Sequence, residues 1–180
     1  MSVLNSYTLL WRHINTGTFM YGTKLRFQDE GTEFNNPLMP SGTVIHDWHM
    51  LTTFSEHKTV PSLPILKKGY HYNVLLNFDA QPQGSAYIKM TFYRKNDTEH
   101  SYLIIKHSDT TFQFPDEAYA YKIELINAGL SHLFFKNIKI QEIDKADTVA
   151  HEIVDSKVNL DVLNRVIFGV RSDMRGGQND

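Results

Sequence analysis

The chain has 180 residues, of which 41% are hydrophobic and 21% are charged, as in one ordinary globular domain. Its net charge of −2 provides no basic field for nucleic acid, and the absence of cysteine excludes disulfides, thiolate nucleophiles and cysteine metal sites. No apolar run reaches the ~20 residues that span a bilayer, and no signal-peptide pattern is present. We therefore expect a cytoplasmic protein with no membrane span and no nucleic-acid partner.

The first third of the chain is predicted to form less regular strands. Three segments rich in β-branched and aromatic residues are candidates: YTLLW (7–11), FMYGTKLRF (19–27) and GTVIHDW (42–48). The carboxylates of Asp29, Glu30 and Glu33 fall in a glycine-containing stretch that we interpret as a solvated loop. Two acids cleave a glycosidic bond only when they are held at a defined separation across the sugar, and this local run provides no such arrangement.

The stretch NPLMPSGTVIHDWH (36–49) combines two prolines, a glycine, two histidines and one of two tryptophans. Prolines restrict the backbone on both sides of Leu38 and Met39, and Gly42 suits the last position of a turn. Leu38, Met39 and Trp48 also make the region strongly apolar. Since rigid apolar groups lose little entropy on docking, we interpret the stretch as a structural turn or a protein interface.

Two histidines in this stretch, His46 and His49, are the strongest metal-ligand candidates. Zinc requires three or four ligands, and side chains three residues apart on a strand point to opposite faces. The glutamate and spacing of the zinc-protease motif are also missing. We therefore predict no metal, no other cofactor and no catalytic residues.

From Tyr70 onward the hydrophobic period is two, which is typical of strands with one buried face. In YHYNVLLNF the predicted buried face carries Tyr70, Tyr72, Val74, Leu76 and Phe78. Similar segments follow: AYIKMTFY (86–93), SYLIIK (101–106), TFQF (111–114), YAYKIELI (119–126) and HLFFKNIKIQEI (132–143). Eight or nine short strands joined by turns predict an all-β fold, an antiparallel β-sandwich of jelly-roll type. An up-and-down barrel is the alternative.

The pattern changes after residue 143, so we predict a sandwich domain over 1–143 and a C-terminal linker, short helix and tail over 144–180. Asn159 suits a helix cap. Apolar residues follow it at helical spacing: Leu160, Leu163, Val166, Ile167 and Val170. Such a stripe would pack either on the sandwich itself or on a partner.

Aromatic side chains provide the only candidate ligand platform. We predict that Tyr87, Tyr93 and Tyr121 lie on strand faces opposite the aliphatic residues, with Asn73 and Asn77 nearby to match sugar hydroxyls. One interpretation is a glycan-binding face, as in a stand-alone carbohydrate-binding module. The other is that the N-terminal segment or another protein covers this face.

Several of these stretches together resemble a known family. They are NPLMPSGTVIHDW (36–48), PSLPIL (61–66), the strand pair at 70–93, FPDEAYAYKIELINAG (114–129) and HLFFKNIKI (132–140). They are similar to the smallest of the three accessory secretory proteins of the Gram-positive accessory Sec system. The likeness extends over about residues 7–143 and includes no motif after residue 144.

This resemblance implies a non-enzymatic subunit with a fold like that of carbohydrate-binding modules. Its implied partners are the two sister accessory secretory proteins, the accessory Sec ATPase and a glycosylated serine-rich-repeat adhesin awaiting export. It also implies a cytoplasmic protein that reaches the membrane translocon peripherally, through its partners. The family offers no catalytic residues to transfer to this chain.

Overall fold

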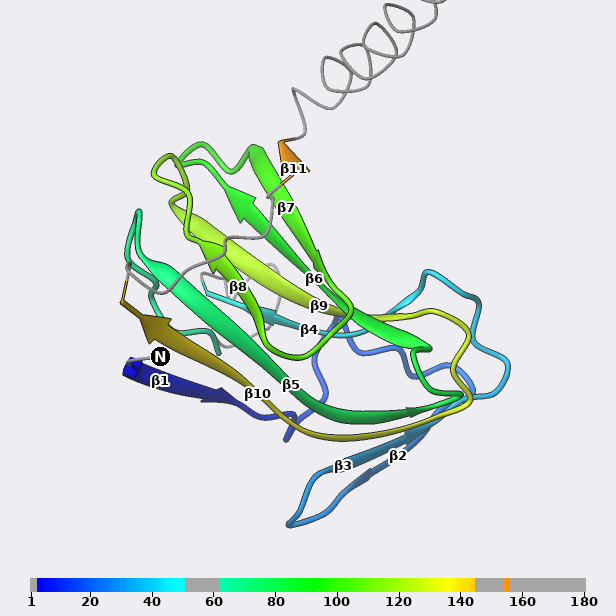
Figure 1. The fold of residues 1–180 in the computed structure, drawn as a ribbon. Coiled ribbons are helices and arrows are strands. Elements are labelled where there is room, and N and C mark those ends of the chain that lie inside the picture. Colours follow the sequence, from blue (N-terminus) through cyan, green and yellow to red (C-terminus); the bar gives the residue numbers. More distant parts are fainter. Residues whose placement is uncertain (1–2, 51–61, 145–153, 156–180) are drawn as a thin grey trace, which may run out of the picture.

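The computed structural model describes residues 3–50, 62–144 and 154–155, and these form two antiparallel sheets packed face to face (Figure 1). The six-stranded sheet contains β1 (Val3–Leu9), β2 (Lys24–Phe27), β3 (Thr32–Asn35), β5 (His71–Gln81), β8 (Thr110–Gln113) and β10 (His132–Ile143). The five-stranded sheet contains β4 (Val44–His49), β6 (Ala86–Tyr93), β7 (Glu99–Ile105), β9 (Ala120–Asn127) and β11 (Val154–Asp155). The predicted jelly-roll sandwich is confirmed.

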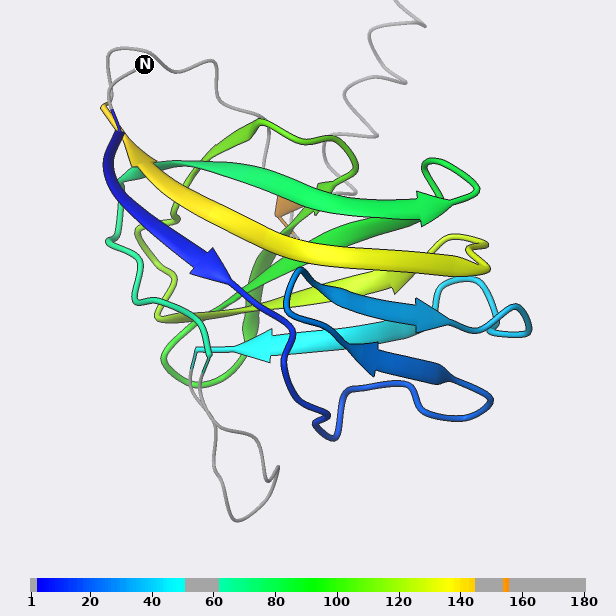
Figure 2. The same cartoon turned by 90° about the horizontal axis from the view of Figure 1, so that it is seen from below.

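Strand β10 is the centre of the six-stranded sheet. It pairs along its length with β5, and its other side pairs first with β3 and then with β1 (Figure 2). A register shift between Phe135 and Asn137 marks a bulge near the point where the pairing changes from β3 to β1. In the second sheet, β9 lies between β6 and β4. Residues far apart in the sequence are therefore brought together on two central strands.

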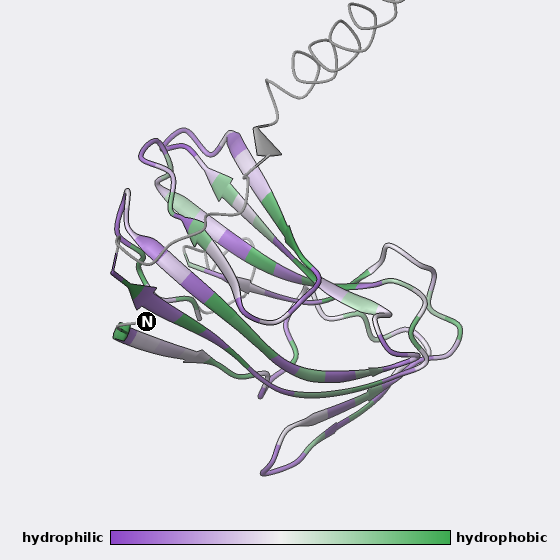
Figure 3. Ribbon diagram, viewed as in Figure 1, coloured by the Kyte–Doolittle hydropathy of each residue, from purple (hydrophilic) through white to green (hydrophobic). Residues whose placement is uncertain are grey.

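Hydrophobic and hydrophilic residues alternate along the strands (Figure 3). The buried hydrophobic side chains form one core between the sheets. The largest buried side chains include Trp11, Trp48, Tyr72, Tyr121, Phe34, Phe92, Phe112, Phe114 and Phe135. Each buried ring removes ~150–250 Å² from water, so the aromatic residues contribute much of the hydrophobic stabilisation. The period-two pattern is confirmed for Tyr72 and Val74, which are fully buried. It is wrong for Tyr70, which precedes β5 and is 46% exposed.

The acidic segment near residue 30 is more ordered than the sequence indicates. Gln28 and Gly31 exchange backbone hydrogen bonds of 2.8 and 3.3 Å, closing a hairpin between β2 and β3. Glu33 therefore lies on a strand and not in a loop, and its Oε1 atom is 3.0 Å from His132 Nε2.

We expect Gly31→Ala to lower the free energy of unfolding by about 2 kcal/mol, because tightly packed sites accept no extra carbon without strain. A Cβ atom at Gly31 would lie 2.5 Å from the backbone oxygen of Phe135. Urea unfolding of both proteins measures the difference. An unchanged midpoint would show that the hairpin moves freely away from β10.

The predicted C-terminal helix at 159–170 lies outside the described residues. Within the predicted linker, Val154 and Asp155 form β11 and pair with Tyr102 and Ser101 of β7. The domain boundary at 143/144 stays a prediction. Among the described residues, no helix has the length and apolar character that would cross a membrane.

Candidate interaction surface

The turn before β4 is held rigidly at both ends. Asn36 is buried, and its side-chain oxygen accepts a hydrogen bond of 3.2 Å from Leu38 N, which closes the first part of the turn. Thr43 N donates to Pro40 O at 3.3 Å, and Gly42 adopts a φ of +87°, which glycine accepts without strain. The predicted structural turn is present between Asn36 and Thr43.

Asn127 fixes this turn to the β9–β10 loop. Its buried side-chain nitrogen donates to Met39 O and Pro40 O at 3.1 and 3.0 Å. Its oxygen accepts from Gly129 N and Leu130 N at 2.9 and 2.7 Å. One buried amide therefore satisfies four backbone groups from two loops.

The three apolar residues predicted to mark this stretch have different roles. Met39 and Trp48 are buried in the core, and Trp48 donates from its indole nitrogen to Leu10 O at 3.0 Å. Leu38 instead projects from the turn and is 90% exposed. Of the three, Leu38 alone is available to a partner.

A second exposed turn is tied to the first. Asn36 Nδ2 donates to Tyr21 O at 2.8 Å and to Thr23 Oγ1 at 3.0 Å. Tyr21 is 89% exposed, and its neighbour Met20 is partly exposed. We call Met20, Tyr21 and Leu38 the Tyr21–Leu38 surface. Exposed apolar groups on two turns that are held by hydrogen bonds have the properties of interface anchors. Their backbone is already ordered, so little conformational entropy is lost when a partner binds.

The geometry around His46 and His49 is that of a packed core. A bulge in the pairing after Val44 directs His46 inward, where it stacks on Trp11 and meets Trp48 edge to face, each at 4.7 Å between ring centroids. Its Nδ1 atom is 2.7 Å from Thr18 Oγ1. Burial lowers the pKa of His46 to about 3, although the charge of Asp47 partly opposes this shift. Such a histidine is neutral at physiological pH.

His49 lies on the other face of β4, with its Nε2 atom 3.1 Å from Asp47 Oδ2. Burial by itself would raise the pKa of Asp47, but the hydrogen bond and charge of His49 lower it. The two histidines therefore do not converge. Within residues 3–50, 62–144 and 154–155, no cluster of three or more His, Asp or Glu side chains could hold a metal ion.

The residues predicted to form one glycan platform do not share a surface. Tyr87 and Tyr93 are half-buried on the outer face of β6, as expected. Tyr121 is a correction: it points into the core and donates to Pro64 O at 2.6 Å. Asn73 is buried against Asp109, and exposed Asn77 lies with it on β5, in the other sheet.

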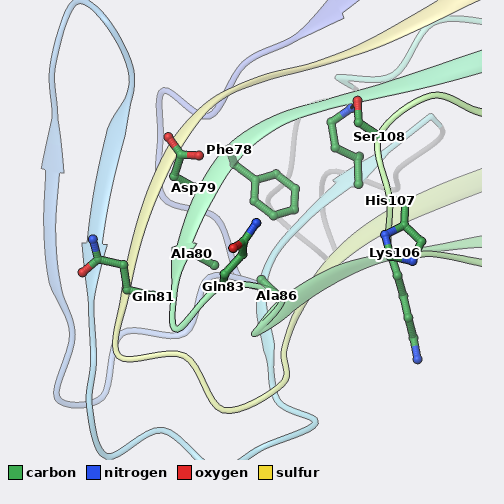
Figure 4. A pocket seen from close by; sticks show the side chains of 11 residues that line it. Phe78, Asp79, Ala80, Gln81, Gln83, Ala86, Lys106, His107 and Ser108 are labelled. Atoms are coloured by element: carbon green, nitrogen blue, oxygen red, sulfur yellow. Dashed lines mark hydrogen bonds between the residues drawn. The ribbon is translucent and has the colours of Figure 1, made fainter.

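Two features of the surface were not predicted from the sequence. Tyr21 lies in a segment that resembles a strand, and only the Tyr-Gly pair indicates a turn there. A groove of about 860 Å³ lies beside the second half of β5 (Figure 4). The groove depends on which strands pair and on their different lengths, for which the local sequence carries no signal.

A β-sandwich that exposes apolar side chains on hydrogen-bonded turns has the features of a binding module. The comparisons with known proteins identify the family. A profile described as "Accessory Sec secretory system ASP3" matches residues 18–142, and the chain belongs to this family.

Two relatives show the same relationship. The accessory Sec system protein ASP3 of Staphylococcus aureus is 42% identical over 168 residues, covering 90% of this chain and 53% of that protein. The chain thus spans about half the length of this relative. The accessory Sec system protein ASP3 of Streptococcus gordonii is 33% identical over 127 residues, covering 70% of this chain and 80% of that protein.

Two solved structures are similar to this fold. A structure of accessory secretory proteins 1, 2 and 3 from Streptococcus pneumoniae contains a chain with a TM-score of 0.71 and 32% identity, covering 76% of this chain and 96% of that one. The glycosylation-associated Gap123 complex from Streptococcus agalactiae gives a TM-score of 0.73 and 30% identity, covering 83% of this chain and 49% of that one. In both structures the similar chain was solved together with other proteins.

Proposed function

We propose that this protein is a non-enzymatic interaction subunit of an accessory Sec export complex. Its direct partners are the two sister accessory secretory proteins, which it binds in the cytoplasm. Through them it assists the accessory Sec ATPase and the export of glycosylated serine-rich-repeat adhesins at the membrane. Membership of the ASP3 family and the likeness to chains solved with other proteins of such systems support this assignment.

The observation that carries the proposal at residue level is the Tyr21–Leu38 surface. Leu38 and Tyr21 are the two most exposed large apolar side chains among the described residues. The buried amides of Asn36 and Asn127 hold their turns in place. An isolated domain gains nothing from this exposure, whereas burial of both side chains against a sister protein would release water from apolar surface.

We expect Leu38→Asp to weaken binding to the sister proteins at least tenfold, about 1.4 kcal/mol. The matched control is Ile65→Asp, because Ile65 is 78% exposed and lies near the opposite end of β4. Both variants should unfold within about 0.5 kcal/mol of the wild type. Calorimetric titration with the sister proteins measures the affinity of each variant, and only Leu38→Asp should bind more weakly than the wild type. Equal affinity of the wild type and Leu38→Asp for the sister proteins would show that the Tyr21–Leu38 surface does not bind them.

A second candidate function is direct glycan binding on the outer face of the five-stranded sheet. Half-buried Tyr93 and Tyr102 lie there beside Lys122 and Lys89, with ammonium-to-ring distances of 6.0 and 4.9 Å. Aromatic rings beside charged groups can contact both the C–H faces and the hydroxyls of a sugar. Titration with glycosylated and unglycosylated adhesin repeats tests this function. Equal binding to both would exclude the sugar as ligand.

A further inference from the structure

The edge of the six-stranded sheet is only half covered. Strand β8 pairs with β5 from His71 to Val74 and no further. From Leu76 to Gln81, β5 pairs with β10 on one side and borders the groove on the other (Figure 4). The turn at Gln83 and Gly84, the start of β6 and the β7–β8 loop complete the walls.

The open edge presents backbone hydrogen-bonding groups in a regular row. Gln81 O accepts from Ser131 N at 2.8 Å, on the side of β10. Leu76 N donates to Ser108 Oγ at 3.2 Å, on the opposite side. Because the N–H and C=O groups of successive residues alternate between the two sides of an antiparallel strand, those of Phe78 and Ala80 point towards the groove.

The groove has an apolar floor on β5, and its polar side chains come from Gln83 and from Lys106, His107 and Ser108 of the β7–β8 loop. The ring of Phe78 points into it, whereas Asp79 and Gln81 point away (Figure 4). Leu76, Phe78 and Ala80 are partly buried against the core, and Ala86 forms the opposing wall. Small residues on that wall leave room for the side chains of an incoming segment.

We propose that this groove binds an extended segment of a partner protein by strand addition. About five residues of that segment would pair antiparallel with Leu76–Ala80 and continue the pairing that β8 makes on the first half of β5. The main-chain groups of Phe78 and Ala80 would form hydrogen bonds with the segment. Every second side chain of the segment would be apolar and would pack on Phe78 and Ala86. A glycan fits less well, because the polar side chains of β5, Asp79 and Gln81, turn away and leave an apolar floor beneath a row of unpaired backbone groups (Figure 4).

The first test uses the acetylated heptapeptide Ser-Val-Thr-Val-Thr-Val-Glu as a probe, titrated into the full chain and followed by amide NMR. We expect shifts and slowed hydrogen exchange at Phe78 and Ala80, whose N–H groups become paired. The same peptide, N-methylated at the residues that face β5, should bind roughly fivefold more weakly, since each lost hydrogen bond weakens binding by about twofold to tenfold.

The second test uses Ala80→Pro, which removes an N–H on the groove side and leaves the pairing with β10 intact. It should weaken peptide binding by a similar factor, whereas Asn96→Ala, in an exposed turn that does not line the groove, should leave peptide binding unchanged. The proposal is overturned if the peptide leaves Phe78 and Ala80 unperturbed, or if neither proline nor N-methylation changes its affinity. Binding of N-acetylglucosamine in the groove without binding of the peptide would also overturn it. The Tyr21–Leu38 surface is tested independently.

Discussion

Lowering the pH from 7 to 4 should cost the protein about 3 kcal/mol of folding free energy through His46 alone. Burial between Trp11 and Trp48 lowers the pKa of this residue from 6.5 to about 3. Below pH 6.5 the unfolded chain binds a proton at His46 that the folded protein rejects until near pH 3. The unfolded state therefore binds more protons over this window, and stability falls as the pH falls.

Urea unfolding at several pH values, compared between wild type and His46→Gln, isolates this contribution. The variant lacks the titrating group, so the stability difference between the two proteins should change by about 3 kcal/mol between pH 7 and pH 4. Exposed His107 provides the control, because His107→Gln should follow the wild type. If the free energy of unfolding changed with pH equally in the wild type and in His46→Gln, protonation of the buried imidazole would not destabilise the folded protein.

The second large loss of stability is expected when Asn127 is replaced. Replacing it with alanine leaves Met39 O, Pro40 O, Gly129 N and Leu130 N without their side-chain partner. We expect a loss of about 3 kcal/mol in the free energy of unfolding, because each buried group left unpaired costs ~1–3 kcal/mol and some will regain water.

The matched control is Asn96→Ala, since Asn96 also accepts hydrogen bonds in a turn but is exposed. It should cost less than about 1 kcal/mol. Chemical unfolding measures both variants. Asn127→Ala should also weaken sister-protein binding, because the turn that carries Leu38 loses its attachment. Equal stability of the Asn127→Ala and Asn96→Ala variants would contradict this view of the turn.

The two-sheet fold could be predicted because alternation is a local property. Each strand from β5 to β10 carries a period of two, and one buried face follows directly from it. The same alternation predicts a buried Tyr121. It is two residues from Ile123 and therefore shares its buried face.

The remaining features depend on contacts between distant segments. His46 points inward because of a bulge after Val44, and Asn73 is buried because the β7–β8 loop brings Asp109 to it. Strand β3 was not predicted, because its four residues follow an acidic turn and gain their pairing from β2 and β10. Register and strand pairing are set by the whole sheet, so the local sequence indicates Leu38 as an anchor but cannot locate Tyr21 beside its turn.

If this sandwich works as a subunit of an assembly, it should form one complex with its two sister proteins. Light scattering after mixing the protein with its two sister accessory secretory proteins tests this claim most directly. We expect one species with the combined mass of the three proteins and no free 20.8 kDa chain at equal stoichiometry. A 20.8 kDa species that persists beside its sisters at micromolar concentration would contradict it.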